Sequence, residues 1–283
     1  MDLQLGDKRA LVTGGSRGLG KAIALELARE GAAVVIAARS AAALRESALD
    51  IERQTGATVA TVVLDVMDPE SIAACVAEAV DRLGGLDILV NAAARTGGHG
   101  EEADVYASAS EEGMLADFQE KVVGSLRLAR AAEPHLHAAG GGRIILFSGG
   151  AGRFRGGLVS AGARNRAINN LTLTLANALG SSGIGVVCIA PGNAVTERQM
   201  DAHRVAAEEA GLPVEDHLRE RAARTTLLGR LTLAGDVAKV GAFLSSPLSW
   251  PINAAVVEVS GGSSPDVHYD LDPHPPWKPG TAV

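Results

Sequence analysis

Short apolar segments alternate with longer segments of helical periodicity along nearly the whole chain. Several short segments are continuously apolar, such as Ala-Val-Val-Ile-Ala-Ala at 33–38, which is typical of parallel strands covered on both faces. Regular alternation of this kind predicts β-α-β units and a doubly wound parallel sheet of about seven strands. The predicted strands are Arg9–Thr13, Ala33–Ala38, Thr58–Leu64, Leu86–Val90, Arg143–Phe147, Gly185–Ile189 and Ala255–Val259. The predicted helices span 18–30, 41–54, 69–83, 113–139, 160–180 and 235–245.

The 283 residues suit one large α/β domain, which we assign to residues 1–262, followed by a Pro-rich tail at 263–283. Segments 94–113 and 193–232 interrupt the alternation at the ends of strands, where open α/β sheets bind ligands. The tail has two interpretations that the sequence leaves open: a loose terminus, or a subunit contact or pocket lid.

Composition excludes several classes of partner. The net charge is −7 with no basic block and only 3% aromatic residues, so a nucleic-acid partner is not expected. No apolar run reaches the roughly 18–20 residues of a membrane span, and the N-terminus has no signal-peptide pattern. Cys75 and Cys188 lie in apolar periodic segments, which indicates structural thiols in a reducing compartment and predicts a cytoplasmic protein. The histidines do not group at metal-ligand spacing, so no metal site is expected.

A cluster of glycines follows the first predicted strand and opens the first predicted helix. It reads Thr13-Gly14-Gly15-Ser16-Arg17-Gly18-Leu19-Gly20. Residues without a Cβ allow a tight turn and a close approach of the backbone to a pyrophosphate, which the free N–H groups of the helix N-terminus can then bind. The sequence therefore predicts a dinucleotide site here.

The glycine spacing and three later landmarks together resemble the short-chain dehydrogenase/reductase family over residues 5–262. The landmarks are Asp65-Val66, Asn91-Ala92-Ala93-Ala94, and Pro191-Gly192 with Thr196. The resemblance implies a single Rossmann-fold domain in which Asp65 and Val66 flank the adenine and Thr196 contacts the nicotinamide carboxamide. It also implies that Asn91 steadies the fourth strand, although Ala92 and Ala94 depart from the family's Asn-Asn-Ala-Gly. The predicted cofactor-binding residues are Gly14, Ser16, Arg17, Gly18, Leu19, Gly20, Arg39, Asp65, Val66, Asn91, Ala92, Asn165, Pro191, Gly192 and Thr196.

The end of the second strand favours NADP(H) over NAD(H). An acidic residue there would bind a ribose 2′-hydroxyl and repel a 2′-phosphate. This chain instead has Arg39, and the glycine cluster contributes Arg17. Two guanidinium groups suit a phosphate through charge-assisted, bidentate hydrogen bonds.

The resemblance also implies four active-site residues: Asn, Ser, Tyr and Lys, with tyrosine as the proton donor. Ser148 follows the fifth strand and matches the serine, while Ala161 and Asn165 stand at the positions of the tyrosine and lysine. Lys121 replaces the asparagine. A register shifted by one residue would place Gly149 at the serine position instead.

Alanine cannot donate a proton, and a serine hydroxyl alone titrates too high for acid–base work near neutrality. We therefore take Ser148 and Lys121 as the candidate catalytic residues, because burial and nearby cations would lower the pKa of Lys121. Tyr106 and His99 are other candidates. Four arginines could bind an anionic substrate group: Arg153, Arg155, Arg164 and Arg166. An ordinary structural or solvated role is the alternative for each of these residues.

Three functions agree with this pattern. The first is an NADP(H)-dependent oxidoreductase with an atypical site that acts on a small-molecule carbonyl or alcohol. The second is a non-redox isomerase, lyase, dehydratase or cyclase on the same scaffold, as Ala161 and Asn165 would permit. The third is a non-catalytic NADP(H)-binding protein. A homodimer or homotetramer is expected from the family.

Overall fold

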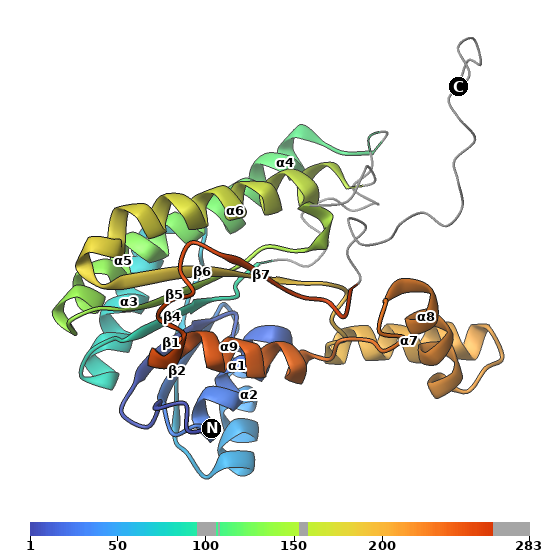
Figure 1. The fold of residues 1–283 in the computed structure, drawn as a ribbon, viewed down its shortest axis with the longest axis horizontal. Coiled ribbons are helices and arrows are strands. Elements are labelled where there is room, and N and C mark those ends of the chain that lie inside the picture. The colour runs from blue at the N-terminus through green and yellow to red at the C-terminus, as the bar shows by residue number, and fades with distance from the viewer. Residues whose placement is uncertain (95–105, 107, 153–157, 263–283) are drawn as a thin grey trace.

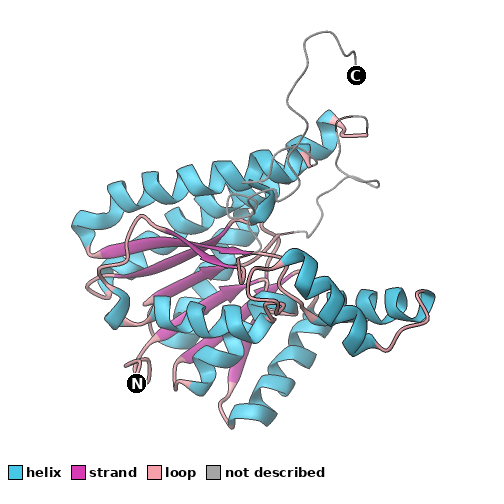
Figure 2. Ribbon diagram, turned by 45° about the vertical axis from the view of Figure 1, so that its right-hand side comes forward, coloured by secondary structure: helices cyan, strands magenta, loops and turns pink. Residues whose placement is uncertain are grey.

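The computed structural model describes residues 1–94, 106, 108–152 and 158–262. Within these residues, seven parallel strands form one sheet in the order β3-β2-β1-β4-β5-β6-β7 (Figures 1 and 2). The strands are β1 Arg9–Thr13, β2 Ala33–Ala38, β3 Val59–Val63, β4 Ile88–Asn91, β5 Gly142–Phe147, β6 Ile184–Pro191 and β7 Val256–Val259. The predicted fold, a doubly wound parallel sheet in a single Rossmann-like domain, is confirmed.

Helices connect the strands and cover both faces of the sheet (Figure 1). They are α1 Gly18–Arg29, α2 Ala41–Thr55, α3 Pro69–Leu83, α4 Glu111–Asp117, α5 Gly124–Ala138, α6 Val159–Leu179, α7 Glu197–Glu209, α8 Val214–Thr225 and α9 Ala234–Ser245. Capping residues mark the ends of these helices, as α3 illustrates. Asp68 caps α3 by accepting the Glu70 N–H, Pro69 is its first residue, and Gly84 in the left-handed region (φ 71°) ends it.

The core has two halves, one on each face of the sheet. Successive side chains of a strand point to opposite faces, so Val12 of β1 packs with α1, α2 and α9 while Leu11 packs with α3, α5 and α6. Both residues are fully buried. This double coverage explains why the central strands read as continuous apolar runs.

The strand order reverses direction beside β1. From β1 the chain proceeds to β2 and β3 on one side and then returns to β4 on the other side. The connections leaving β1 and β4 therefore diverge, and in such sheets the ligand binds at this point, beyond the carboxyl ends of the strands.

Several predicted boundaries were wrong. The helix predicted at 113–139 begins at Glu111 and is interrupted by a π-helical segment, η1 (Phe118–Val123), between α4 and α5. Strands β4 and β6 extend to Asn91 and Pro191, beyond their predicted ends, because both residues remain paired with a neighbouring strand. The interrupting segment 193–232 contains α7 and α8, and the predicted tail 263–283 lies outside the described residues. In the part of the chain that is described, no helix is both long and apolar enough to cross a membrane.

Candidate active site and dinucleotide site

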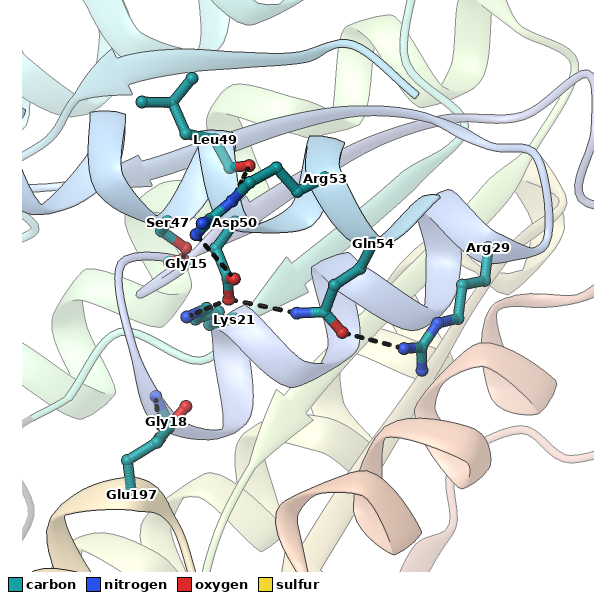
Figure 3. A network of polar contacts seen from close by, with 10 residues as sticks. All are labelled: Gly15, Gly18, Lys21, Arg29, Ser47, Leu49, Asp50, Arg53, Gln54 and Glu197. Atoms are coloured by element: carbon teal, nitrogen blue, oxygen red, sulfur yellow. Dashed lines mark hydrogen bonds and ion pairs between the residues drawn. The ribbon is translucent and has the colours of Figure 1, made fainter. Parts of the chain in front are cut away.

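The glycine cluster forms a compact turn between β1 and α1. Gly14 adopts a positive φ of 71°, and a Cβ on it would lie 2.7 Å from the Ala92 carbonyl oxygen. A Cβ on Gly20 would lie 2.3 Å from the Gly14 carbonyl oxygen. Ser47 of α2 stabilises the turn, because its Oγ donates to the Gly15 carbonyl oxygen at 2.8 Å (Figure 3). Glycine is required at Gly14 and Gly20 because any side chain would collide with backbone.

The N-terminus of α1 already holds an oxyanion. The N–H of Gly18, the first residue of α1, donates to Glu197 Oε2 at 3.2 Å (Figure 3). The Arg17 side chain makes no capping hydrogen bond there. This N–H can therefore donate to an oxyanion, as binding of the dinucleotide predicted from the sequence would require.

The two arginines of the predicted phosphate site are both solvent-exposed. Arg17 belongs to the glycine cluster after β1, and Arg39 follows the last residue of β2. These strands are neighbours in the sheet, with Thr13 paired to Ala37. Arg17 and Arg39 therefore emerge at the same edge of the sheet, without an acidic residue at the end of β2.

Asp65 and Val66 follow β3 at this edge. Asp65 Oδ1 accepts the Met67 N–H at 2.9 Å, and the Asp65 N–H donates to Ser71 Oγ at 2.9 Å. Val66 is buried in the core half that contains α3 and α5. These contacts fix the turn that would face the adenine.

A buried hydrogen-bond chain links β1 and β4 to the helix that carries Lys121. Thr13 Oγ1 donates to Asn91 Oδ1 at 2.8 Å, and Asn91 Nδ2 donates to Ser125 Oγ at 2.7 Å. Ser125 Oγ in turn donates to the Lys121 carbonyl oxygen. We did not single out Ser125 from the sequence. The available signal was a small polar residue one helical turn after Lys121 in an otherwise apolar stretch.

Lys121 lies inside the π-helical segment η1, and the residue is only 9% exposed. Its Nζ donates to the Ser148 carbonyl oxygen at 3.1 Å and to Asn165 Oδ1 at 2.7 Å. The structure thus brings together three predicted residues from η1, the end of β5, and α6. π-Helical segments occur preferentially at functional sites, and here the wider turn carries the lysine.

Burial, and to a smaller extent the charge of Arg164, lower the pKa of Lys121 from its ordinary 10.5 to about 7. Asp117, Glu120 and the Cys188 thiol act in the opposite direction. The lowered pKa agrees with the expectation from the sequence, and it lets the amine exchange a proton near neutral pH.

Ser148 and Ala161 complete the inner part of the site. The Ser148 N–H donates to the Ile189 carbonyl oxygen at 3.0 Å, which anchors the residue to β6. Its buried Oγ makes no hydrogen bond of good geometry among the described residues, and the Cys188 thiol is the polar group that interacts with it. Ala161, predicted from the resemblance to stand at the position of the family's tyrosine, is buried in α6. A buried hydroxyl whose polar neighbour is a weakly hydrogen-bonding thiol would gain from a hydrogen bond to a ligand oxygen.

The remaining candidates lie elsewhere. The prediction that Arg164 binds a substrate anion is not supported, because its Nη1 lies 3.1 Å from Asp117 Oδ1 and the two side chains are only 4% and 2% exposed. Ser160 Oγ donates to the other Asp117 oxygen. Tyr106 is 95% exposed and Arg166 is also exposed. His99, Arg153 and Arg155 lie outside the described residues.

No group of three or more His, Cys, Asp or Glu among residues 1–94, 106, 108–152 and 158–262 could hold a metal ion. Cys75 and Cys188 are both buried free thiols, and burial raises the pKa of each.

A parallel sheet with a glycine turn at its switch point and a lysine–serine–asparagine cluster beyond β5 defines a Rossmann-like α/β protein. Residues 14–264 match a family model described as Enoyl-(Acyl carrier protein) reductase. The chain belongs to the short-chain dehydrogenase/reductase family.

Its relatives include reductases and dehydrogenases. The chain is 34% identical over 263 residues to sorbitol dehydrogenase from Cereibacter sphaeroides, covering 92% of this chain and 99% of the relative. It is 32% identical over 268 residues to the hydroxynaphthalene reductase-like protein Arp2 of Metarhizium anisopliae (strain ARSEF 549), covering 92% of this chain and 96% of the relative. The crystal structure of L-sorbose reductase from Gluconobacter frateurii, complexed with NADPH and L-sorbose, superposes with a TM-score of 0.84 at 29% identity. The superposition covers 93% of this chain and 98% of the reductase.

Proposed function

We propose that this protein is an NADP(H)-dependent oxidoreductase that acts on a small-molecule carbonyl or alcohol and uses Lys121 as its proton donor and acceptor. The observation that carries the proposal is the buried Lys121 amine, held by Ser148 and Asn165 beyond the end of β5. Names of relatives suggest the first substrates to test, namely sorbitol and L-sorbose.

The hydrogen bonds of Lys121 leave one position on its nitrogen for the transferred proton. Two N–H groups are occupied by the Ser148 carbonyl oxygen and Asn165 Oδ1, both of which can only accept. The third position carries a proton in the ammonium form and a lone pair in the neutral amine. The same geometry therefore serves a general acid in carbonyl reduction and a general base in alcohol oxidation.

Ser148 has a separate role in this proposal. Its buried Oγ would donate a hydrogen bond to the substrate oxygen and hold it near Lys121. NADPH, when bound, supplies hydride to the carbonyl carbon, and the glycine turn with Arg17 and Arg39 would hold its phosphates. Asn165 would orient the lysine amine and offer its Nδ2 to a ribose hydroxyl.

In this proposal, Lys121 and Asn165 are a swapped pair: each has the residue type that the family places at the other position. The family has asparagine on the helix before β5 and lysine on the helix after it. This chain has Lys121 and Asn165 in the reverse arrangement, 2.7 Å apart between Nζ and Oδ1. The exchange keeps one amine and one amide between the same two helices, which explains how a site without the usual lysine can retain a titratable cation.

The rate of carbonyl reduction is expected to fall as pH rises above about 7, the pKa of Lys121. Reduction needs the ammonium form, whose population falls about tenfold per pH unit above its pKa. Alcohol oxidation needs the neutral amine and should rise over the same range. Stopped-flow rates of the first turnover, measured with saturating cofactor from pH 5 to 10, test this. A reduction rate that stays constant across pH 7 would remove Lys121 as the acid.

Arg39→Asp is expected to raise the Kd for NADPH about 10- to 100-fold, because one charge-assisted hydrogen bond contributes about 1.5–3 kcal/mol. The introduced carboxylate should also bind the ribose 2′-hydroxyl of NADH and tighten that cofactor. Calorimetric titration of both cofactors measures the change. Arg224→Asp, an exposed arginine on α8, is the matched charge control. Equal binding of NADPH and NADH by the unmodified protein would contradict the proposed preference.

Ala161 favours one alternative, a non-redox enzyme on the same scaffold. The family's tyrosine is absent from this position, and a fold does not dictate its chemistry. Absorbance at 340 nm separates the two functions. Substrate conversion with stoichiometric loss of NADPH absorbance supports the oxidoreductase, whereas conversion at constant absorbance would replace it with an isomerase, lyase, dehydratase or cyclase.

The cytoplasmic location and the homodimer or homotetramer stay predictions. Leu115 on α4 and Leu173 on α6 are at least half exposed, so these helices offer apolar side chains to a second copy.

A further inference from the structure

Glu197 joins two parts of the molecule that are far apart in sequence. Its Oε2 accepts the Gly18 N–H at 3.2 Å, across a separation of 179 residues (Figure 3). Gly18 begins α1 at the glycine turn, and Glu197 begins α7. The Thr196 side chain also lies beside the glycine turn, because a Cβ on Gly18 would lie 3.6 Å from Thr196 Cγ2.

The contact satisfies a position that suits an anion. The N–H groups of the first helical turn have no partner within their own helix, and the helix macrodipole places partial positive charge there. Arg17 is the N-cap residue of α1, but its side chain makes no capping hydrogen bond to the first turn of the helix. The Glu197 carboxylate supplies an anionic oxygen at this position, as a phosphate would. A second anion entering the turn would meet both the occupied N–H and the charge of Glu197.

Helices α7 and α8 form a unit that Glu197 ties to the glycine turn. The unit has its own small apolar cluster, in which Val195, Ala222 and Leu231 are buried. At its base, Val195 forms a bridge with Leu233 and its N–H donates to the Thr232 carbonyl oxygen at 2.8 Å. Both helices extend away from the edge of the sheet (Figure 1). A change at Glu197 would therefore act on the start of α7 without disturbing the main core.

We propose that Glu197 is an internal substitute for a cofactor phosphate, and that dinucleotide binding displaces its carboxylate from Gly18 and releases the start of α7. This inference rests on the proposed dinucleotide function. It assigns Glu197 two effects: it weakens cofactor binding by competition, and it links the cofactor site to the α7–α8 unit that follows β6.

The first test is calorimetric titration with 2′-phospho-ADP-ribose, which carries the phosphates of NADPH without nicotinamide. Glu197→Gln and Glu197→Ala are both expected to bind this probe about 2- to 5-fold more tightly than the unmodified protein, as loss of one anion at a helix N-terminus implies. Glu209→Gln, which removes an exposed carboxylate from the other end of α7, is the matched control and should leave the Kd unchanged. Unchanged or weaker binding in both Glu197 variants would overturn the proposal.

The second test is amide hydrogen exchange, which does not depend on activity. In the unmodified protein, the probe should speed exchange in the first turn of α7. In Glu197→Ala, exchange there and at Gly18 should already be fast without the probe. If the unmodified protein binds neither NADPH nor the probe, the proposed function fails. Exchange in Glu197→Ala then still tests the contact, and unchanged protection at Gly18 would overturn the role of Glu197.

Discussion

Lys121→Met is expected to lower the turnover of carbonyl reduction by about 10²- to 10⁴-fold, the usual contribution of a positioned general acid. Methionine approximates the length of the lysine side chain but cannot donate a proton to the substrate. Methionine should keep the packing of η1 against α6, although it removes the donor to the Ser148 carbonyl oxygen and Asn165 Oδ1, so denaturant unfolding should confirm that the variant is folded. First-turnover rates with NADPH and a carbonyl substrate measure the loss, while the Kd for NADPH should change little.

Two further variants sharpen this result. Lys121→Gln keeps amide donors for Ser148 and Asn165 but does not titrate, so it should be as slow as Lys121→Met and lose the pH dependence near 7. Lys239→Met removes an exposed lysine from α9 and should keep full activity. If Lys121→Met or Lys121→Gln reduced substrate at the unmodified rate, Lys121 would have no part in proton transfer.

Gly20→Ala is expected to weaken dinucleotide binding at least about tenfold and to lower the free energy of unfolding by about 1–3 kcal/mol, the usual cost of overpacking. The added Cβ would lie 2.3 Å from the Gly14 carbonyl oxygen and 2.7 Å from its carbon. Both are backbone atoms, so the glycine turn itself must shift. Calorimetric titration with NADPH and denaturant unfolding measure the two effects.

Gly235→Ala is the matched control for this substitution. Gly235 lies in α9, and a Cβ there would meet nothing within 4 Å. We expect unchanged NADPH binding and equal or greater stability, because alanine favours a helix more than glycine does. Tight NADPH binding by Gly20→Ala would show that the turn between β1 and α1 is not the phosphate site.

The distribution of sequence signals explains which parts of the site were predictable. The glycine turn depends on residues that are adjacent in sequence and whose backbone demands are local, so Gly14 and Gly20 could be identified directly. Asn165 and Lys121 could be placed through the family resemblance, but the hydrogen bond between them could not. They are 44 residues apart, and only the packing of η1 against α6 brings Nζ to Oδ1.

Other features gave no reliable signal. The π-helical segment Phe118–Val123 lies inside one continuous helical pattern, because apolar periodicity cannot distinguish a single wide turn. Arg164 was one candidate for binding a substrate anion. In the structure its guanidinium is buried between two helices and pairs with Asp117. The contact of Glu197 with Gly18 depends on where the chain after β6 crosses the sheet edge.

The sequence by itself determined the parallel α/β architecture. It also predicted the position of the dinucleotide turn and the replacement of the family's tyrosine and lysine, since each depends on periodicity or residue identity at a local position. Tertiary structure decided the environment of Lys121. Its burial, the two acceptors Ser148 and Asn165, and the charge of Arg164 come from separate elements that meet only in the folded chain. A pKa depends on the surroundings of a group in space, so only the fold could turn a lysine in a helical pattern into a candidate acid near neutral pH.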